Sequence, residues 1–228
     1  MAEYREPSFG VGAGFARYRG PAFDTAAHCH AAFQIAIALD GEVAMVDADG
    51  ECHRGAALVV PPMARHRMLA GTDLVTFFIE PHSAFADRLR GLCGDGVTVV
   101  DELRDLDEAE VRSGLPSRAI DPRLLAAMDA VTTPGWSMPE VAARVGLSPQ
   151  RLRALARRQL GMPLPRWRVW VRLRRTAEAL GAGDSLADAA VAGGFADQAH
   201  LSRWMREMMG LTPTETLPAL RARPGRAG

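Results

Sequence analysis

The chain has 228 residues, 48% of them hydrophobic and 24% charged, which is typical of a globular protein with a buried core. No window holds the ~18 consecutive apolar residues of a membrane span, and no apolar stretch of a signal sequence follows the charged first residues. Three cysteines are too few, and odd in number, for a disulfide framework. We therefore expect a cytoplasmic protein that does not contact a membrane.

The formal net charge of zero is divided unevenly along the chain. Residues 1–120 carry 11 Arg and 18 acidic side chains, a net charge of −7, whereas 121–228 carry 16 Arg and 9 acidic side chains, a net charge of +7. All 27 basic residues are Arg. A compact basic segment is typical of a domain that binds a polyanion such as DNA.

Short apolar runs separated by turn signals cover the first half and predict an antiparallel β domain over 1–100. The expected strands are 33–39, 43–46, 56–60, 74–79 and 97–100. Between the last two strands, Ser83 is expected to cap a helix that runs to Leu92. An acidic stretch follows, interrupted by Gly114 and Pro116, and we expect 101–120 to be a linker.

Helical signals begin at Asp121, an N-cap followed by Pro122, and an internal repeat dominates the rest of the chain. The pattern of 137–147 recurs 48 residues later in 185–195, and after a one-residue insertion Gly161 matches Gly210. Each copy has a short helix, a turn glycine and a second helix with a good N-cap, Ser148 or Asp197, which predicts two helix-turn-helix units. A long helix that opens at Pro165 is expected to join them.

The second helix of each unit separates into a core face and an exposed polar face. The expected core residues are Leu152, Leu155, Ala156, Leu201, Trp204, Met205 and Met208. The expected exposed residues are Gln150, Arg153, Arg157, Gln198, Ala199, Ser202, Arg203 and Arg206. An Arg-rich helix face is often merely solvated, but the repeat, the caps and the charge of +7 together favour a DNA-reading face.

The segment 186–213 resembles the signature of the AraC/XylS family of bacterial transcription regulators. Gly194-Phe195 stands at its turn, and Gly210-Leu211-Thr212-Pro213 closes the second recognition helix. The resemblance covers about 121–217 and implies that the two units enter successive major-groove segments, about 34 Å apart. It places base-reading positions at Gln150, Arg153, Ala199, His200 and Arg203, to which Arg157 and Arg206 add further DNA contacts. Ala199 departs from the pattern because its methyl group forms no hydrogen bond.

The first half resembles the two cupin motifs, which implies a β-barrel domain. His28, His30 and His66 match the histidines of those motifs. Three positions depart from the motifs: Gln34 stands where the family has Glu, Met63 where it has Gly, and Ala70 where it has Asn. If 28–30 is a strand, its two histidines face one side and His66 approaches from a neighbouring strand. Three imidazoles with Gln34 form a donor set for Zn, Ni or Fe with one position open. The alternative is that these histidines belong to the cupin frame and line an organic-ligand pocket without a metal.

These features predict a two-domain α+β protein: a cupin-like antiparallel β-barrel over 1–100, a linker over 101–120, and an all-α domain with two helix-turn-helix units over 121–228. The expected function is a DNA-binding transcription regulator, not an enzyme, whose partners are promoter DNA and a small-molecule or metal effector. One alternative is a cupin metalloenzyme, in which the basic half has no role. Another is a DNA-binding protein whose first half only dimerises. The sequence leaves open the effector, the direction of regulation, and whether a homodimer forms through the Ser83–Leu92 helix.

Overall fold

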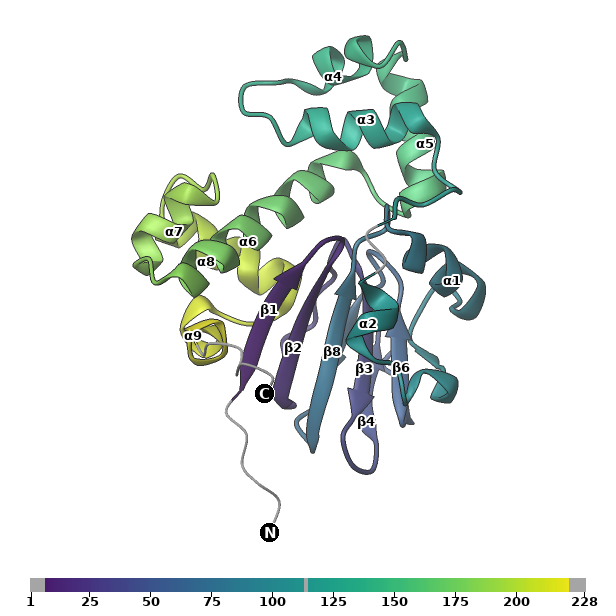
Figure 1. Ribbon diagram of the computed structural model, residues 1–228, viewed down its shortest axis with the longest axis vertical. Helices are drawn as coiled ribbons and strands as arrows, with labels where there is room; N and C mark the ends of the chain where they lie inside the picture. The colour runs from purple at the N-terminus through teal and green to yellow at the C-terminus, as the bar shows by residue number, and fades with distance from the viewer. Residues whose placement is uncertain (1–6, 113–114, 222–228) are drawn as a thin grey trace.

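The computed structural model describes residues 7–112 and 115–221 (Figure 1). Residues 113–114 of the expected linker, including Gly114, and the two ends of the chain, 1–6 and 222–228, lie outside the described residues. A sheet-rich amino-terminal domain adjoins a helical domain that extends over one end and one side of it (Figure 1). No helix in the described ranges is long and apolar enough to cross a membrane.

Nine strands are present in the described part of the chain, and they form two sheets in which every pairing is antiparallel. One sheet has the order β1-β2-β8-β3-β6-β9 and the other has the order β5-β4-β7. The strands are β1 (Ser8–Gly12), β2 (Phe15–Pro21), β3 (Phe33–Ala38), β4 (Val43–Asp47), β5 (Cys52–Gly55), β6 (Ala57–Val60), β7 (His66–Met68), β8 (Asp73–Ile79) and β9 (Thr98–Val99). The prediction of an antiparallel, sheet-rich first domain is confirmed.

Strand β3 is central to this domain, because it pairs with β6 on one side and β8 on the other. Side chains alternate between the two faces of the strand, and Ile35 points into a hydrophobic core that it shares with helix α1 (Ala84–Leu92). The opposite face of β3 carries Ala36, in a second core with Met45 of the smaller sheet, and Gln34, which is buried. Gln34 is thereby placed on the inner face of the larger sheet.

Part of the expected linker packs against the sheet domain. It contains a 3₁₀ turn (η1, Asp101–Leu103) and helix α2 (Glu108–Val111), which Asp107 caps. Leu103 and Val111 are buried in the same core as Ile35. Arg17 of β2 also donates to Glu108 across 2.9 Å. This stretch therefore contributes to the sheet domain's core as well as leading to the helices.

The helical half consists of seven helices in the described residues. They are α3 (Pro122–Val131), α4 (Met138–Arg144), α5 (Pro149–Leu160), α6 (Leu164–Ala182), α7 (Leu186–Ala192), α8 (Gln198–Met209) and α9 (Pro213–Arg221). Helices α4 and α5 form one helix-turn-helix unit, α7 and α8 form the other, and α6 runs between them (Figure 1). Gly146 and Gly194 turn the chain within the two units with φ of 68° and 89°, values that favour glycine. The predicted pair of units joined by a long helix is confirmed.

Candidate DNA interface and interdomain site

The first recognition helix, α5, presents the predicted polar face to solvent. Gln150, Arg153 and Arg157 are exposed, whereas Leu152 and Ala156 are buried in the helical core. Ser148 caps the helix by accepting a hydrogen bond from the backbone N–H of Arg151 at 3.2 Å. This arrangement leaves the polar face of α5 accessible to a DNA groove.

The second recognition helix, α8, presents Ala199, Arg203 and Arg206 to solvent, but it holds His200 differently. The His200 ring is partly buried, lies edge-on to Phe195 with centroids 5.5 Å apart, and its Nε2 accepts a hydrogen bond from Trp204 Nε1 at 3.0 Å. A hydrogen bond from His200 to a base would compete with this contact. Its role as a base reader stays a prediction, as do the roles of the other DNA-facing residues.

The arginines of the two recognition faces differ from Arg174 of α6 in their partners. Among ion pairs between described residues, none involves Arg153, Arg157, Arg203 or Arg206. By contrast, Arg174 of α6 pairs with Glu80 of the sheet domain. Exposed guanidinium groups without a protein partner are available for phosphates and base edges.

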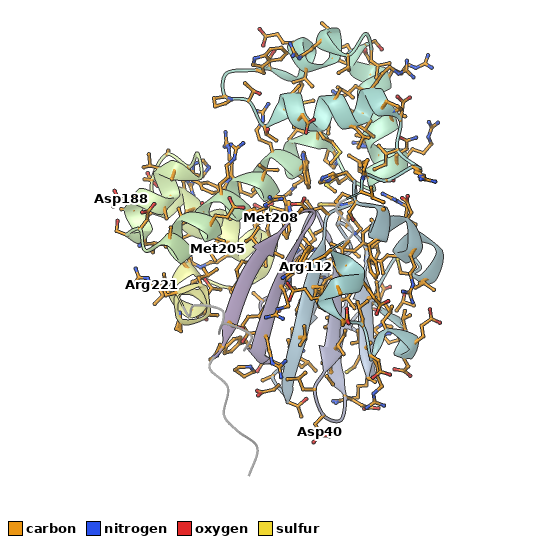
Figure 2. The ribbon with its side chains drawn as sticks, viewed as in Figure 1. Asp40, Arg112, Asp188, Met205, Met208 and Arg221 are labelled. Atoms are coloured by element: carbon orange, nitrogen blue, oxygen red, sulfur yellow. The ribbon has the colours of Figure 1, made fainter. Side chains whose placement is uncertain are left out.

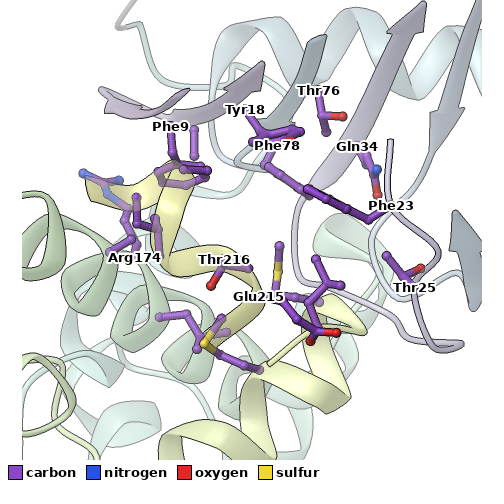
Figure 3. Close-up of a pocket in the computed structure, with 18 of the residues that line it drawn as sticks. Phe9, Tyr18, Phe23, Thr25, Gln34, Thr76, Phe78, Arg174, Glu215 and Thr216 are labelled. Carbon is purple, nitrogen blue, oxygen red and sulfur yellow. The ribbon is translucent and has the colours of Figure 1, made fainter. Parts of the chain in front are cut away.

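An apolar cavity of about 170 Å³ lies between the two domains. Figure 3 shows residues of the sheet domain, among them Phe9, Tyr18 and Phe78, on one side, and Arg174, Glu215 and Thr216 of the helical domain on the other. Met205, on the second recognition helix (Figure 2), also lines the cavity. The volume is more than ten times the ~10–15 Å³ that one water requires, so a small organic molecule fits.

An ion pair between the buried Glu80 and the partly exposed Arg174 crosses the domain boundary beside this cavity. Glu80, 1% exposed, follows β8 and accepts hydrogen bonds from Arg174 Nη1 at 3.0 and 3.1 Å and from Trp170 Nε1 at 3.1 Å. His82 Nε2 lies 3.7 Å from the same carboxylate, and burial lowers the pKa of His82. The Glu80 carboxylate thus fixes the sheet domain to the helix that joins the two DNA-binding units.

Sequence analysis did not identify this ion pair, although α6 contained a signal for it. Arg174 lies four residues after Trp170 and three before Ala177, so it falls on the apolar stripe of the helix. A cation on such a stripe indicates a buried anionic partner. The sequence signal at Glu80 is weaker, because it consists only of a carboxylate that stands between an apolar strand and Pro81.

The structure brings His28, His30 and His66 together, and we name them the histidine cluster. They are 3%, 0% and 1% exposed, and one ring nitrogen of each lies within 4.8 Å of the others. The local geometry is not the regular strand that was expected. His28 and His66 form an isolated antiparallel bridge, with reciprocal backbone hydrogen bonds of 2.9 and 3.0 Å, and His30 lies outside any strand.

Burial keeps the histidine cluster neutral. It lowers the pKa of His28 to about 4, with a further contribution from the charge of His30, and it lowers the pKa of His30 and, more strongly, of His66. Met63, where the cupin motif has glycine, adopts φ of 67° and donates its N–H to the His30 carbonyl at 2.8 Å. The left-handed backbone at this position explains why the motif favours glycine there.

Comparisons with known proteins agree with this architecture. A helix-turn-helix domain model matches residues 141–219. No curated protein matches the chain. Among solved structures, ToxT from Vibrio cholerae O395 is 10% identical with a TM-score of 0.60, covering 92% of this chain and 99% of ToxT. ToxT from strain SCE256, solved with an unsaturated fatty acid bound, is 12% identical with a TM-score of 0.58, covering 96% and 98%.

The carboxyl half also matches a shorter regulator structure. The AraC-type protein from Chromobacterium violaceum is 29% identical over 46% of this chain and 96% of its own, with a TM-score of 0.41. The likeness to ToxT shows that the chain has the two-domain fold of that protein. The model match shows an AraC-type helix-turn-helix domain over residues 141–219, which confirms the predicted resemblance there.

Proposed function

We propose that this protein is a transcription regulator whose affinity for its operator changes when a largely apolar small molecule binds in the interdomain cavity. The two exposed recognition faces supply DNA binding. Because a regulator of this kind acts on promoter DNA, the proposal includes a cytoplasmic location.

The cavity carries the proposal, because its walls belong to both domains. Phe9 and Phe78 come from the sheet domain, whereas Leu173 of α6 and Met205 of α8 come from the helical domain. A molecule between these walls changes how the second recognition helix packs against the sheet domain. Such a contact gives one ligand different affinities for two arrangements of the domains, which is the requirement for regulation.

The lining indicates the chemical class of the ligand. Most lining residues are aliphatic or aromatic, and the charged ones are Arg174 and Glu215. Glu80 already pairs with Arg174, and Glu215 already accepts hydrogen bonds from Thr212. The ligand therefore binds chiefly through apolar contact. The fatty acid bound to ToxT is a molecule of this class.

Each alternative function leaves part of the structure without a role. A cupin metalloenzyme involves the histidine cluster but gives no role to the exposed arginines of α5 and α8, so we propose no catalytic activity. Dimerisation through α1 stays a prediction, and Phe85 and Leu89 on that helix are buried within the sheet domain's own core.

A cavity-filling variant tests the proposal. Ala177 lines the cavity, and Ala177→Leu places three extra carbon atoms in it. Ala126→Leu, on the exposed face of α3, is the matched control. The operator is a duplex selected from random DNA by the wild-type protein, and fluorescence anisotropy measures its affinity with and without octanoate.

We expect octanoate to change the wild-type affinity about 5- to 150-fold, the range of ordinary allosteric coupling. Ala177→Leu should show a shifted affinity without octanoate and no further response, while Ala126→Leu should behave as wild type. The proposal fails if the affinity of Ala177→Leu equals that of wild type and its response to octanoate is unchanged.

A further inference from the structure

The arginines of helix α6 divide into two groups by their partners. Two of them are neutralised by carboxylates, because Arg166 pairs with Glu207 and Arg174 pairs with Glu80. The remaining three, which we name the α6 arginine row, are Arg168, Arg172 and Arg175. Among the ion pairs that join described residues, none involves a member of this row.

The α6 arginine row is a line of like charges on one face of the helix. Its members stand four and three residues apart, spacings that place side chains on the same side of an α-helix. Partial burial lowers the pKa of Arg172, and the positive charges of Arg168 and Arg175 lower it further. Like charges held this close without a counter-ion destabilise the free protein. An anionic partner removes that cost.

Two members of the row are held in place by the surrounding protein. Arg168 donates from Nε to the Val131 carbonyl at 2.7 Å and from Nη2 to the Trp136 carbonyl at 2.8 Å. Arg172 lies across the turn of the second unit, where a Cβ on Gly194 would be 3.5 Å from Arg172 Nε. An arginine that merely solvates a helix face needs no such contacts. The fixed positions therefore favour a binding surface.

These contacts place the row between the two DNA-binding units (Figure 1). Trp136 comes just before α4, the first helix of one unit, and Gly194 comes just before α8, the recognition helix of the other. The Arg168 end of the row adjoins the first unit and the Arg172 end adjoins the second. The seven-residue span of the row rises ~10 Å along the helix, which matches about three phosphates of one DNA strand at ~3.4 Å each.

The geometry of DNA indicates which phosphates lie opposite the row. Two recognition helices one turn apart, ~34 Å, enter successive segments of the major groove on one side of the duplex. The minor groove faces the protein midway between those segments. Its two rims are phosphates that lie across a groove ~6 Å wide. A cationic helix between the units is complementary in charge to these rims.

We propose that the α6 arginine row binds phosphates on the rim of the minor groove, midway between the two segments that α5 and α8 read. The helix that joins the units is then a third DNA contact, which adds affinity without reading bases. This inference rests on the proposed function for DNA binding itself, and it assigns contacts outside the recognition helices.

Salt dependence tests the contact, because each phosphate contact releases counterions. Fluorescence anisotropy measures the affinity of the full-length protein for the selected duplex and for a random duplex over a range of salt. Arg172→Gln should weaken binding to both duplexes by the same factor, ~10-fold, and should reduce the slope of log affinity against log salt by about 1. Arg172→Lys keeps the charge and should keep the wild-type slope. Arg104→Gln is the matched control, because Arg104 is exposed on the sheet domain and should leave affinity and slope unchanged.

Urea unfolding separates loss of the contact from loss of folding. Arg172→Gln removes a like charge, so its urea midpoint should equal or exceed that of wild type. Arg175→Gln changes the exposed end of the row and should reduce the salt slope in the same way. A lower midpoint of Arg172→Gln together with a wild-type salt slope would show that Arg172 only supports the turn at Gly194, and it would overturn the proposal.

Neutral methylphosphonate linkages locate the phosphates. Placed midway between the two read segments of the selected duplex, they should weaken binding by wild type ~10-fold and binding by Arg172→Gln much less, because that variant has already lost a contact there. Equal losses for the two proteins, or no loss for wild type, overturn the proposed contact. If wild type still prefers the selected duplex and responds to octanoate while Arg172→Gln keeps the wild-type slope, the inference about α6 fails and the proposed function stands.

Discussion

Gly210, at the carboxyl end of the second recognition helix, makes the contact between the domains testable with a single methyl group. Its φ is 66°, and a Cβ there would lie 2.4 Å from the Ala26 carbonyl oxygen, 2.7 Å from His28 Nδ1 and 2.9 Å from Thr25 Cβ. The Gly210 carbonyl also accepts a hydrogen bond from the Ala26 N–H at 3.0 Å. Any side chain at position 210 must therefore separate α8 from the segment that carries His28.

Gly146 provides the matched comparison. It has a similar φ of 68°, but a Cβ there would meet no atom within 4 Å. Gly146→Ala should lower the free energy of unfolding by ~1 kcal/mol, the cost of a left-handed alanine. Gly210→Ala incurs the same backbone cost and adds an overpacking cost of ~1–3 kcal/mol, giving ~2–4 kcal/mol in total.

Urea unfolding of the two full-length variants, followed by tryptophan fluorescence, measures both free energies. Operator affinity with and without octanoate is measured in parallel. Gly210→Ala should also reduce the response to octanoate, because it loosens the contact between α8 and the sheet domain, whereas Gly146→Ala should not. Equal destabilisation by the two substitutions would refute the close approach of the domains at Gly210.

Three further predictions concern the ion pair, a buried histidine and the recognition face. Arg174→Ala should lower the free energy of unfolding in urea by ~3–5 kcal/mol, because it leaves the buried Glu80 carboxylate without its cation. Glu80→Gln should lower that free energy by less than half as much. Equal losses for the two variants would contradict this asymmetry. Burial lowers the pKa of His82, so as the pH falls through its ordinary value of 6.5 the unfolded chain takes up a proton that the folded chain does not, and stability should fall over this interval. His82→Gln should show a smaller fall in urea midpoint over this interval, and an undiminished fall would show that His82 does not contribute. Arg153→Ala should weaken operator binding by ~1–3 kcal/mol with less effect on random DNA, whereas Arg157→Ala should weaken both alike; anisotropy titrations that show the same loss on both duplexes for each variant would contradict the base-reading assignment.

The helical half was predictable because its signals are local. The caps Ser148 and Asp197, and the turn glycines Gly146 and Gly194, fix helix ends through backbone geometry within a few residues. The internal repeat then supplied the architecture, since two copies of one unit require a connection between them. Features that depend only on neighbouring residues were therefore predictable.

Strands β1 and β2, at one edge of the larger sheet, were missed for the opposite reason. Gly10 and Gly12 in β1 read as turn signals, yet Phe9 and Val11 alternate with them and line the cavity. Their burial depends on α6 and α9, which lie far along the chain. The pattern of apolar residues within such an edge strand does not by itself predict it.

The candidate sites also divide into a part that local sequence signals predicted and a part that depends on distant residues. The convergence of the histidine cluster followed from motif spacing, although the backbone there forms a bridge instead of a regular strand. The contact between Glu80 and Arg174 joins residues 94 positions apart, and the cavity joins residues as far apart as Phe9 and Leu220, so both depend on how the domains pack. No periodicity or capping signal encodes that distance.

The central claim is that α5 and α8 read a specific DNA sequence. Its most direct test is the affinity of the full-length protein for a duplex selected from random DNA, compared with a scrambled duplex of the same composition over a range of salt concentrations. We predict at least ~10³-fold tighter binding to the selected duplex and a steep loss of affinity for both duplexes as salt rises. Equal affinity for the two duplexes, or affinity that does not depend on salt, would contradict the assignment of this protein as a sequence-specific regulator.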